Sequence, residues 1–495
     1  MTRLAISKSS YLTSFILVIF GLLTLNSCKE TDTSEKSILL YGAAGIKPAI
    51  EKIAKDYYQE YGVRVDIQYG GSGTLLANLR IAGQGDLYLA GDKSYIDEAE
   101  KFGLIDEVQP LAYIKPVIAV AKGNPKGITQ LEDLFRKDIK VCMANPDVAA
   151  IGKATKEILE TSGDWAELEK NITVFMPTVN EVANSIKIGA TDAGIIWDAT
   201  ANQYDNIETI SLPVFETNTK NITIAVLKSS TKPTEALRFL RYLSARDKGL
   251  PTFKQFGYQA IDGDLWEYTP EILFYSGGVN RVAIEQTIRA FEEREGVEVI
   301  RVYNGCGILV SQMKAGEQPD AYLSCDVSFM SQVENRFTDI TDISNTDIII
   351  ATQKGNPKNI QSLNDLSRKG LMIGVCNHQQ SALGSLTKDL LEKAGLWEAI
   401  NVNIRSQTPT ADLLVNQLRT GSLDAVIVYA ANVSKVKDKI TVVNIHLKEA
   451  NALQNFGVSI NSNHTYLVKR LLKSLTAQSS KDHYLENGFN WEYDQ

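Results

Sequence analysis

The loop around Ser72 has the residue types that a binding loop for a small polar ligand needs. Ser72 lies between Gly71 and Gly73 in the sequence YGGSGTL. Glycines let the backbone approach a ligand closely, and a serine hydroxyl can donate a hydrogen bond to it. The alternative is an ordinary turn, in which serine is a common residue. The loop alone leaves both interpretations open.

Three cysteines and a histidine in the second half of the chain form a second candidate site. Cys306 lies in a later copy of the glycine-rich loop, and Cys325 ends the next predicted strand. Cys376 begins the segment CNHQQSALG, which also contains His378. We expect these residues at strand ends that face one crevice, where thiolates and an imidazole would suit zinc or copper(I). The alternatives are a disulfide between Cys306 and Cys325, which an oxidising compartment permits, and free thiols.

No motif for catalysis accompanies these residues. The sequence has no nucleophile-elbow pattern, phosphate-binding glycine motif or HExxH, and its four histidines are scattered. Asp92 and Asp326 each follow a predicted strand and precede a predicted helix, so we expect helix caps rather than catalytic carboxylates. Cys142, inside the strand KVCMA, is expected to be a small core residue. The chain is therefore not expected to be an enzyme or to carry a cofactor.

An internal duplication sets the domain organisation. Residues 38–94 recur as residues 272–328, at an offset of 234 residues, with identical glycines, aromatics and aspartates at matching positions. A repeat of about half the chain indicates two homologous domains, each large enough for its own core. The later matches are KGNPK at 122–126 and 354–358, and the segments IGATDAGIIW and TGSLDAVIVY, which end at Trp197 and Tyr429.

The first 28 residues predict export. Arg3 and Lys8 precede an apolar run from Phe15 to Leu25, which the sequence LNSC closes at Cys28. This is the pattern of a signal peptide, and its apolar run is short for a membrane span; an uncleaved anchor is the alternative. The closing sequence is similar to bacterial lipoprotein signals. This resemblance implies that Cys28 becomes the first residue and carries a lipid.

The remainder of the chain is expected to be extracytoplasmic and soluble. No later stretch of the sequence is apolar for long enough to cross a bilayer. We therefore place the protein in the cell envelope, on the periplasmic side or at the cell surface. The formal net charge is −8, and an acidic surface argues against nucleic acid as a partner.

Each copy of the repeat alternates short apolar strands with helix-period segments. This alternation indicates α/β units with parallel sheets, whose ligands bind in the crevice outside the carboxyl ends of the strands. Tyr113–Ala121 is expected to be one buried strand, and residues 152–160, Lys232–Leu243 and Tyr466–Leu475 are expected to be helices. We divide the chain into a signal peptide 1–27, a tether 28–37, a first domain 38–262, a linker 263–270 and a second domain 271–495.

Five segments of the first half resemble the extracellular solute-binding proteins of ABC importers, most closely the molybdate/tungstate-binding proteins. They are LYGAAGIKPAI, YGGSGTL, GDLYLAGDKSY, the Pro-Asp segment before the predicted helix at 152–160, and AGIIW. The resemblance extends over nearly all of both halves. It implies a periplasmic-binding-protein-like fold in each domain, with two α/β lobes, a hinge and an interlobe cleft. It also implies that the membrane subunits of an ABC importer are partners.

The resemblance also implies a set of ligand positions. In this family a small oxyanion lies in the cleft without counter-charges, held by hydroxyls and by backbone N–H groups at helix N-termini, which carry partial positive charge. Carried over residue by residue, the family positions of the first half are Gly45, Ser72, Ile151, Val179 and Trp197. Those of the second half are Val279, Cys306, Ala411 and Tyr429.

The hydroxyl positions of the family are better preserved in the first half. Gly45 lacks the expected hydroxyl, but Ser72 matches, and the Trp197 indole can donate one hydrogen bond in place of the family's tyrosine. In the second half Val279 and Cys306 replace both serines. The sequence therefore predicts a lipid-anchored protein that captures a small molybdate-like oxyanion, chiefly with its first half. The alternatives are a soft-metal site in the second half, and a receptor or scaffold lipoprotein without transport.

Overall fold

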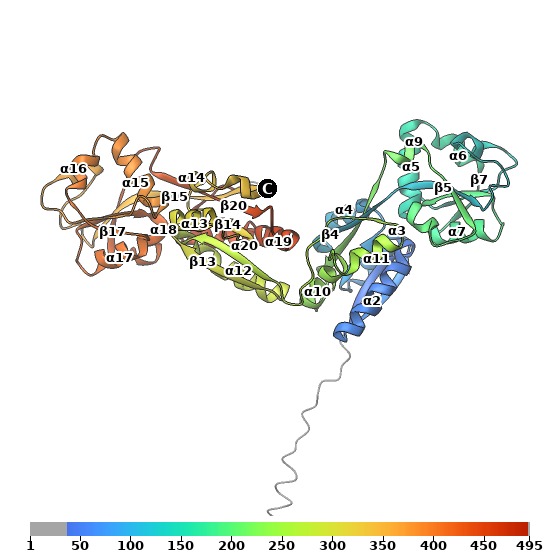
Figure 1. The fold of residues 1–495 in the computed structure, drawn as a ribbon, viewed down its shortest axis with the longest axis horizontal. Coiled ribbons are helices and arrows are strands. Elements are labelled where there is room, and N and C mark those ends of the chain that lie inside the picture. The colour runs from blue at the N-terminus through green and yellow to red at the C-terminus, as the bar shows by residue number, and fades with distance from the viewer. Residues whose placement is uncertain (1–36, 494–495) are drawn as a thin grey trace, which may run out of the picture.

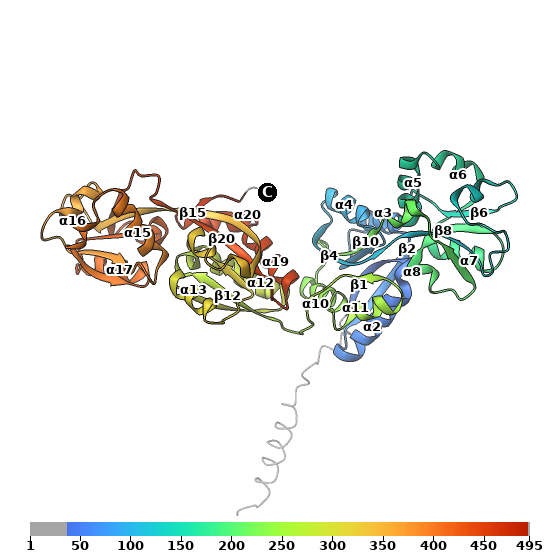
Figure 2. The ribbon, with the colours of Figure 1, turned by 45° about the horizontal axis from the view of Figure 1, so that its top comes forward.

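The computed structural model describes residues 37–493. They form two tandem α/β units, each built from two lobes, and the units follow each other end to end (Figure 1). One lobe of each unit lies next to the other unit and is called the inner lobe, and the outer lobes lie at the two ends of the molecule (Figure 2). The predicted signal peptide, Cys28 and the tether up to residue 36 lie outside the described residues.

The inner lobe of the first unit is a six-stranded sheet of mixed direction. Its strands are β1 (Ser37–Ala43), β2 (Arg64–Gly70), β3 (Leu87–Ala90), β4 (Ile105–Ile114), β10 (Lys220–Leu227) and β11 (Gln259–Ala260), in the spatial order β11-β4-β10-β3-β1-β2. Its helices are the 3-10 helix η1 (Ala44–Ile46), α2 (Lys47–Tyr61), α3 (Ser72–Ala82), α4 (Lys93–Lys101), α10 (Pro233–Leu243) and α11 (Gly249–Gln255).

The outer lobe of the first unit is a five-stranded sheet with its own helices. The strands are β5 (Pro116–Ala121), β6 (Val141–Ala144), β7 (Ile172–Met176), β8 (Ala193–Trp197) and β9 (Ile207–Ile210), in the spatial order β7-β6-β8-β5-β9. The helices are the 3-10 helix η2 (Leu131–Phe135), α5 (Ala150–Ser162), α6 (Trp165–Asn171), α7 (Val179–Lys187), α8 (Asp198–Ala201) and α9 (Pro213–Glu216). Two segments join the lobes, one at Lys115 and one after β9.

The second unit repeats this plan, starting with its inner lobe. The strands of that lobe are β12 (Glu271–Gly277), β13 (Glu298–Asn304), β14 (Ala321–Leu323), β20 (Asn451–Ser459) and β21 (Asn490–Trp491). Its helices are η3 (Gly278–Asn280), α12 (Arg281–Glu295), α13 (Cys306–Lys314), α14 (Val327–Met330), η4 (Glu334–Arg336), α19 (Thr465–Leu475) and α20 (Gln478–Glu486).

A long strand, β15 (Phe337–Gln353), runs from the inner lobe of the second unit into its outer lobe. The other strands of the outer lobe are β16 (Ile373–Cys376), β17 (Ile404–Thr408), β18 (Ala425–Tyr429) and β19 (Ile440–Asn444). Its helices are η5 (Leu363–Ser367), α15 (Ala382–Lys393), α16 (Trp397–Asn401), α17 (Ala411–Arg419), α18 (Ala430–Val433) and η6 (Ser434–Val436).

The expectation of parallel sheets is wrong for part of each lobe. β1 pairs in parallel with β2 and β3, but β10 is antiparallel to β3 and β4, and β5 is antiparallel to β8 and β9. The second unit has the same mixture, with β20 antiparallel to β14 and β15. The antiparallel pairs arise where the chain crosses from one lobe to the other and returns, which the strand-helix alternation does not reveal.

The strand expected at Tyr113–Ala121 is corrected to the end of β4 and the whole of β5. Pro116 lies at the break, and proline has no N–H to donate to a strand ladder. The equivalent residue of the second unit is Ile348, since Pro116 pairs with Trp197 and Ile348 pairs with Tyr429. Ile348 donates its N–H to the Ala450 carbonyl oxygen at 2.9 Å, so β15 continues through this position.

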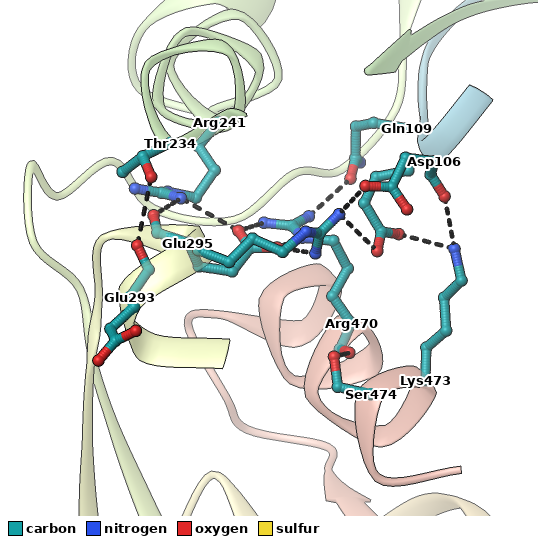
Figure 3. A network of polar contacts seen from close by, with 11 residues as sticks. Asp106, Gln109, Thr234, Arg241, Glu293, Glu295, Arg470, Lys473 and Ser474 are labelled. Carbon is teal, nitrogen blue, oxygen red and sulfur yellow. Dashed lines mark hydrogen bonds and ion pairs between the residues drawn. The ribbon is translucent and has the colours of Figure 1, made fainter. Parts of the chain in front are cut away.

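The inner lobes contact each other through a buried cluster of ion pairs (Figure 3). Glu295, at the end of α12, is fully buried, and its carboxylate lies 3.2 Å from Arg241 Nη1 of the first unit and 2.9 Å from Arg470 Nε of α19. Beside it, Arg294 Nη2 lies 2.7 Å from Asp106 Oδ2 of β4. Lys473 Nζ donates to the Asp106 carbonyl oxygen at 2.7 Å. Charged residues of both units therefore hold the inner lobes together.

Candidate functional site

A pocket between the lobes of the first unit brings together all five positions expected in that half. Gly45 and Ser72 come from the inner lobe, and Ile151, Val179 and Trp197 come from the outer lobe. The cavity volume is about 20 Å³, against the ~10–15 Å³ that one water molecule needs. In this conformation the pocket accommodates only a very small group.

Two helices begin at this pocket without a side-chain cap. α3 starts at Ser72 and α5 starts at Ala150, and neither has a cap hydrogen bond from a side chain. The first N–H groups of a helix have no partner within the helix, and they give its N-terminus a partial positive charge. One of them, the Gly73 N–H, donates to the Val148 carbonyl oxygen of the outer lobe at 2.9 Å. The Thr74 N–H donates to the same oxygen at 3.4 Å. This contact between the lobes thus uses N–H groups of α3, and the uncapped start of α5 remains as a source of hydrogen-bond donors to the cleft.

The two glycines beside Ser72 allow the lobes to close. A Cβ at Gly71 would lie 2.4 Å from the Val148 carbonyl oxygen, and one at Gly73 would lie 2.9 Å from the Asp147 carbonyl oxygen. Gly305 and Gly307 are equally close to the opposite lobe of the second unit. The glycine pattern that predicted close approach to a ligand is thus explained by close approach of the outer-lobe backbone.

The Ser72 hydroxyl is oriented by its neighbour. Ser72 is 2% exposed, and its Oγ accepts a hydrogen bond from the Gly91 N–H at 3.1 Å. Both residues line the pocket. Because the hydroxyl oxygen already accepts a bond from the protein, its own hydrogen is available to donate to a ligand.

Thr200 and Tyr258 also line the pocket, and the sequence did not identify them as site residues. A Cβ at Gly45 would lie 2.9 Å from Val179 Cγ1 and 3.4 Å from Thr200 Oγ1. Thr200 thus supplies a hydroxyl beside the position where Gly45 lacks one. The Tyr258 hydroxyl donates to the Gly45 carbonyl oxygen at 2.9 Å. Thr200 follows the strand AGIIW by only three residues, which is the one sequence signal that points to it.

The polar groups of this pocket are uncharged. Among the described residues, those that line it include no lysine, arginine, histidine, aspartate or glutamate. Its donors are the hydroxyls, the Trp197 indole and the helix starts. Such a set can bind an anion by hydrogen bonds without a counter-charge.

The equivalent pocket of the second unit contains three of the four expected positions. Val279, Ala411 and Tyr429 line it, but Cys306 does not. The Cys306 and Cys325 sulfurs form a disulfide, and Cys325 lines the pocket instead. The Cys325 N lies 2.9 Å from Cys306 Sγ, and the equivalent Gly91 N lies 3.1 Å from Ser72 Oγ. The disulfide therefore occupies the place of the serine donor.

The soft-metal alternative for the second unit is corrected. Two of its four ligands, Cys306 and Cys325, are bonded to each other. Cys376 is a free, buried thiol, and burial raises its pKa to about 11, which disfavours the thiolate that binds a metal. Within residues 37–493, no three His, Cys, Asp or Glu side chains are grouped so that they could hold a metal ion. His378 therefore belongs to no such group.

The remaining sequence predictions concern single residues. Asp92 and Asp326 are confirmed as helix caps, because each accepts a hydrogen bond from the N–H two residues later. Cys142 is confirmed as a core residue, fully buried in β6, with its sulfur 3.0 Å from Thr191 Oγ1. None of the three takes part in either pocket.

A family model of bacterial extracellular solute-binding proteins matches residues 38–259 and matches residues 272–490 again. The chain belongs to this family. It is therefore a tandem solute-binding protein, as the duplication and the family resemblance together predicted. Among residues 37–493, no helix combines the length and apolar character that crossing a membrane requires.

Individual relatives each correspond to one unit in length. A binding protein of Haemophilus influenzae is 29% identical over 222 residues, which cover 45% of this chain and 90% of the relative. The molybdate-binding protein ModA of Mycobacterium bovis is 27% identical over 213 residues, which cover 42% of this chain and 80% of the relative. The structure of the periplasmic molybdate-binding protein of Azotobacter vinelandii aligns with 17% identity and a TM-score of 0.40, covering 45% of this chain and 98% of that one.

Proposed function

We propose that this solute-binding protein captures a small oxyanion of the molybdate or tungstate type in the cleft of its first unit and delivers it to the membrane subunits of an ABC importer. The observation that carries the proposal is the composition of the first pocket. Two uncapped helix starts and the Ser72 hydroxyl converge there, and the described residues that line it include no charged side chain.

This arrangement suits a fully deprotonated oxyanion. Such an ion has only acceptor oxygens, so each one can be matched by an N–H or O–H donor. Hydrogen bonds to a charged group contribute about 1.5–3 kcal/mol each, more than neutral ones. A carboxylate in the pocket would repel the ion, and none of the lining residues has one. The mycobacterial relative, a molybdate-binding protein, supports the same ligand class.

A thermal-shift panel on the full chain tests this proposal. We expect molybdate or tungstate to raise the unfolding midpoint, because a ligand that binds only the folded state stabilises it by about 2.7 kcal/mol at a hundredfold excess over Kd. Sodium chloride at matched ionic strength is the control. If neither molybdate nor tungstate shifts the midpoint beyond that control, the proposed ligand class is wrong.

The lipid anchor is part of the same proposal. A tether that begins at a lipid-modified Cys28 would hold the binding units at the membrane that contains the importer. The mature protein purified from a bacterial host should carry a diacyl group on an N-terminal Cys28, as measured by mass spectrometry. A Cys28→Ser variant should appear unlipidated, and an unmodified Cys28 in the wild-type protein would contradict the anchor.

A further inference from the structure

The second cleft differs from the first because a carboxylate side chain lines it. Asp412 and Asn432 both line its pocket. The corresponding residues of the first unit, at the same distance before and after the shared strand, are Asn180 and Thr200. The Asn432 Nδ2 group donates to Asp412 Oδ1 at 3.3 Å, while Asn432 Oδ1 is buried without a partner. A carboxylate and an amide side chain therefore line the second pocket, and the lining of the first pocket includes neither. Asn180 Oδ1, at the position of Asp412, is also buried without a partner, but Asn180 does not line the first pocket.

The same pocket retains donors for an anion. α13 and α15 begin at it without a side-chain cap, like their counterparts in the first unit. α17 is also uncapped, whereas α7 of the first unit is closed by a capping box between Thr178 and Glu181. The change from Glu181 to Leu413 removes the capping carboxylate in the second unit. The second cleft thus exposes more free helix starts than the first.

Tyr429 supplies an independent sign of a ligand. It is 3% exposed, it lines the pocket, and its hydroxyl has no hydrogen-bond partner among the described residues. A buried hydroxyl without a partner costs free energy, so an occupant that bonds to it would relieve that cost. The cavity volume of about 20 Å³ equals that of the first pocket.

We propose that the second cleft selects a small oxyanion that still carries a proton at neutral pH, with inorganic phosphate as the representative of that class. The helix starts and the Tyr429 hydroxyl would donate to its bare oxygens, and the Asp412 carboxylate would accept the hydrogen of its P–OH group. Sulfate and molybdate have no proton to donate to a carboxylate, so the Asp412 side chain would disfavour them in this cleft. This proposal for the second cleft rests on the oxyanion function proposed for the first cleft.

Calorimetric titration of the full chain with phosphate tests the inference. Saturating molybdate is present throughout, so that the first cleft is occupied. We expect phosphate to bind at one further site and sulfate not to bind there. Asp412→Asn should weaken phosphate binding about tenfold or more and should admit sulfate. Asp438→Asn, which removes a charge that is also exposed but does not line the pocket, is the matched control.

Tyr429→Phe provides a second variant that removes only the unpartnered hydroxyl. We expect it to weaken phosphate binding severalfold. Phosphate affinity within twofold of wild type in Asp412→Asn, with sulfate still excluded, would overturn the inference. So would the absence of any phosphate site. If molybdate itself does not bind, the proposed function of the first cleft fails, while phosphate titrations without molybdate still test Asp412.

Discussion

Arg241 of the first unit and Glu295 of the second unit form an ion pair that is almost completely buried, with 3.2 Å between Nη1 and Oε2. Arg241 Nη1 also donates to the Glu295 carbonyl oxygen at 2.7 Å. The pair joins the inner lobes, and neither residue lines a ligand pocket. The units are therefore docked through the inner lobes, which are neighbours in Figure 1.

Glu295→Gln should destabilise the chain strongly. The substitution keeps the side-chain shape but leaves the arginines at positions 241 and 470 without their buried counter-charge. Breaking a buried pair from one side costs about 3–5 kcal/mol. Urea unfolding measures the loss in free energy of unfolding. Glu293→Gln on the same helix, where the side chain is exposed, is the control; an equal effect of both variants would contradict the role of the cluster.

The same cluster predicts a loss of stability in acid. Burial raises the pKa of Glu295, but the neighbouring Arg470 and Arg241 lower it by a larger amount. The net pKa therefore lies below the ordinary value of 4.5. A lowered folded-state pKa gives stability that is complete above the ordinary value and is lost as the pH falls through the folded pKa. The unfolding midpoint should therefore fall more steeply below pH 4.5 in the wild type than in Glu295→Gln. Parallel pH profiles would argue against this coupling.

Reduction of the disulfide should destabilise the second unit. Cys306 and Cys325 are 19 residues apart, and closing a loop of this length contributes about 3 kcal/mol in the chain-entropy model. The double variant Cys306→Ser, Cys325→Gly reproduces the Ser72 and Gly91 pair of the first unit and should lose a comparable amount. Urea unfolding of the wild type with and without dithiothreitol measures the effect. Unchanged unfolding in the presence of reductant would contradict it.

Thr200→Val should weaken oxyanion binding in the first cleft. Valine has nearly the shape of threonine but no hydroxyl, so the variant removes one donor beside Gly45. A hydrogen bond contributes about 0.5–1.5 kcal/mol, more to a charged group, which corresponds to about a fivefold loss or more. Calorimetric titration with molybdate measures it. Thr200→Ser keeps the hydroxyl and should bind like the wild type, and equal binding by the valine variant would remove Thr200 from the site.

The sequence predicted the parts of the site that depend on local pattern. The glycine-flanked Ser72 begins α3, and Trp197 ends β8, because turns and strand ends have recognisable residue types. Thr200 was missed because nothing in its own neighbourhood marks it. Its place beside Gly45 depends on how the two lobes close, which is a tertiary relationship.

The contact between the units could not be predicted for a similar reason. Arg241 and Arg470 are 54 and 175 residues away from Glu295 in the chain. In the sequence, each looks like an ordinary charged residue on the surface of a predicted helix. The disulfide was one of three alternatives for the cysteines, since their pairing depends on how β14 and α13 pack. Only the folded inner lobe brings Cys306 and Cys325 together.

The most direct test of the account is a calorimetric titration of molybdate into the full-length wild type and into Ser72→Ala. The Ser72 hydroxyl accepts from the Gly91 N–H and has its hydrogen free for a ligand, so its removal should weaken binding about fivefold or more. That result would place the oxyanion in the first cleft. Molybdate affinity that is the same in both proteins would contradict the account, because the oxyanion would then be held without the donor on which the proposed site is built.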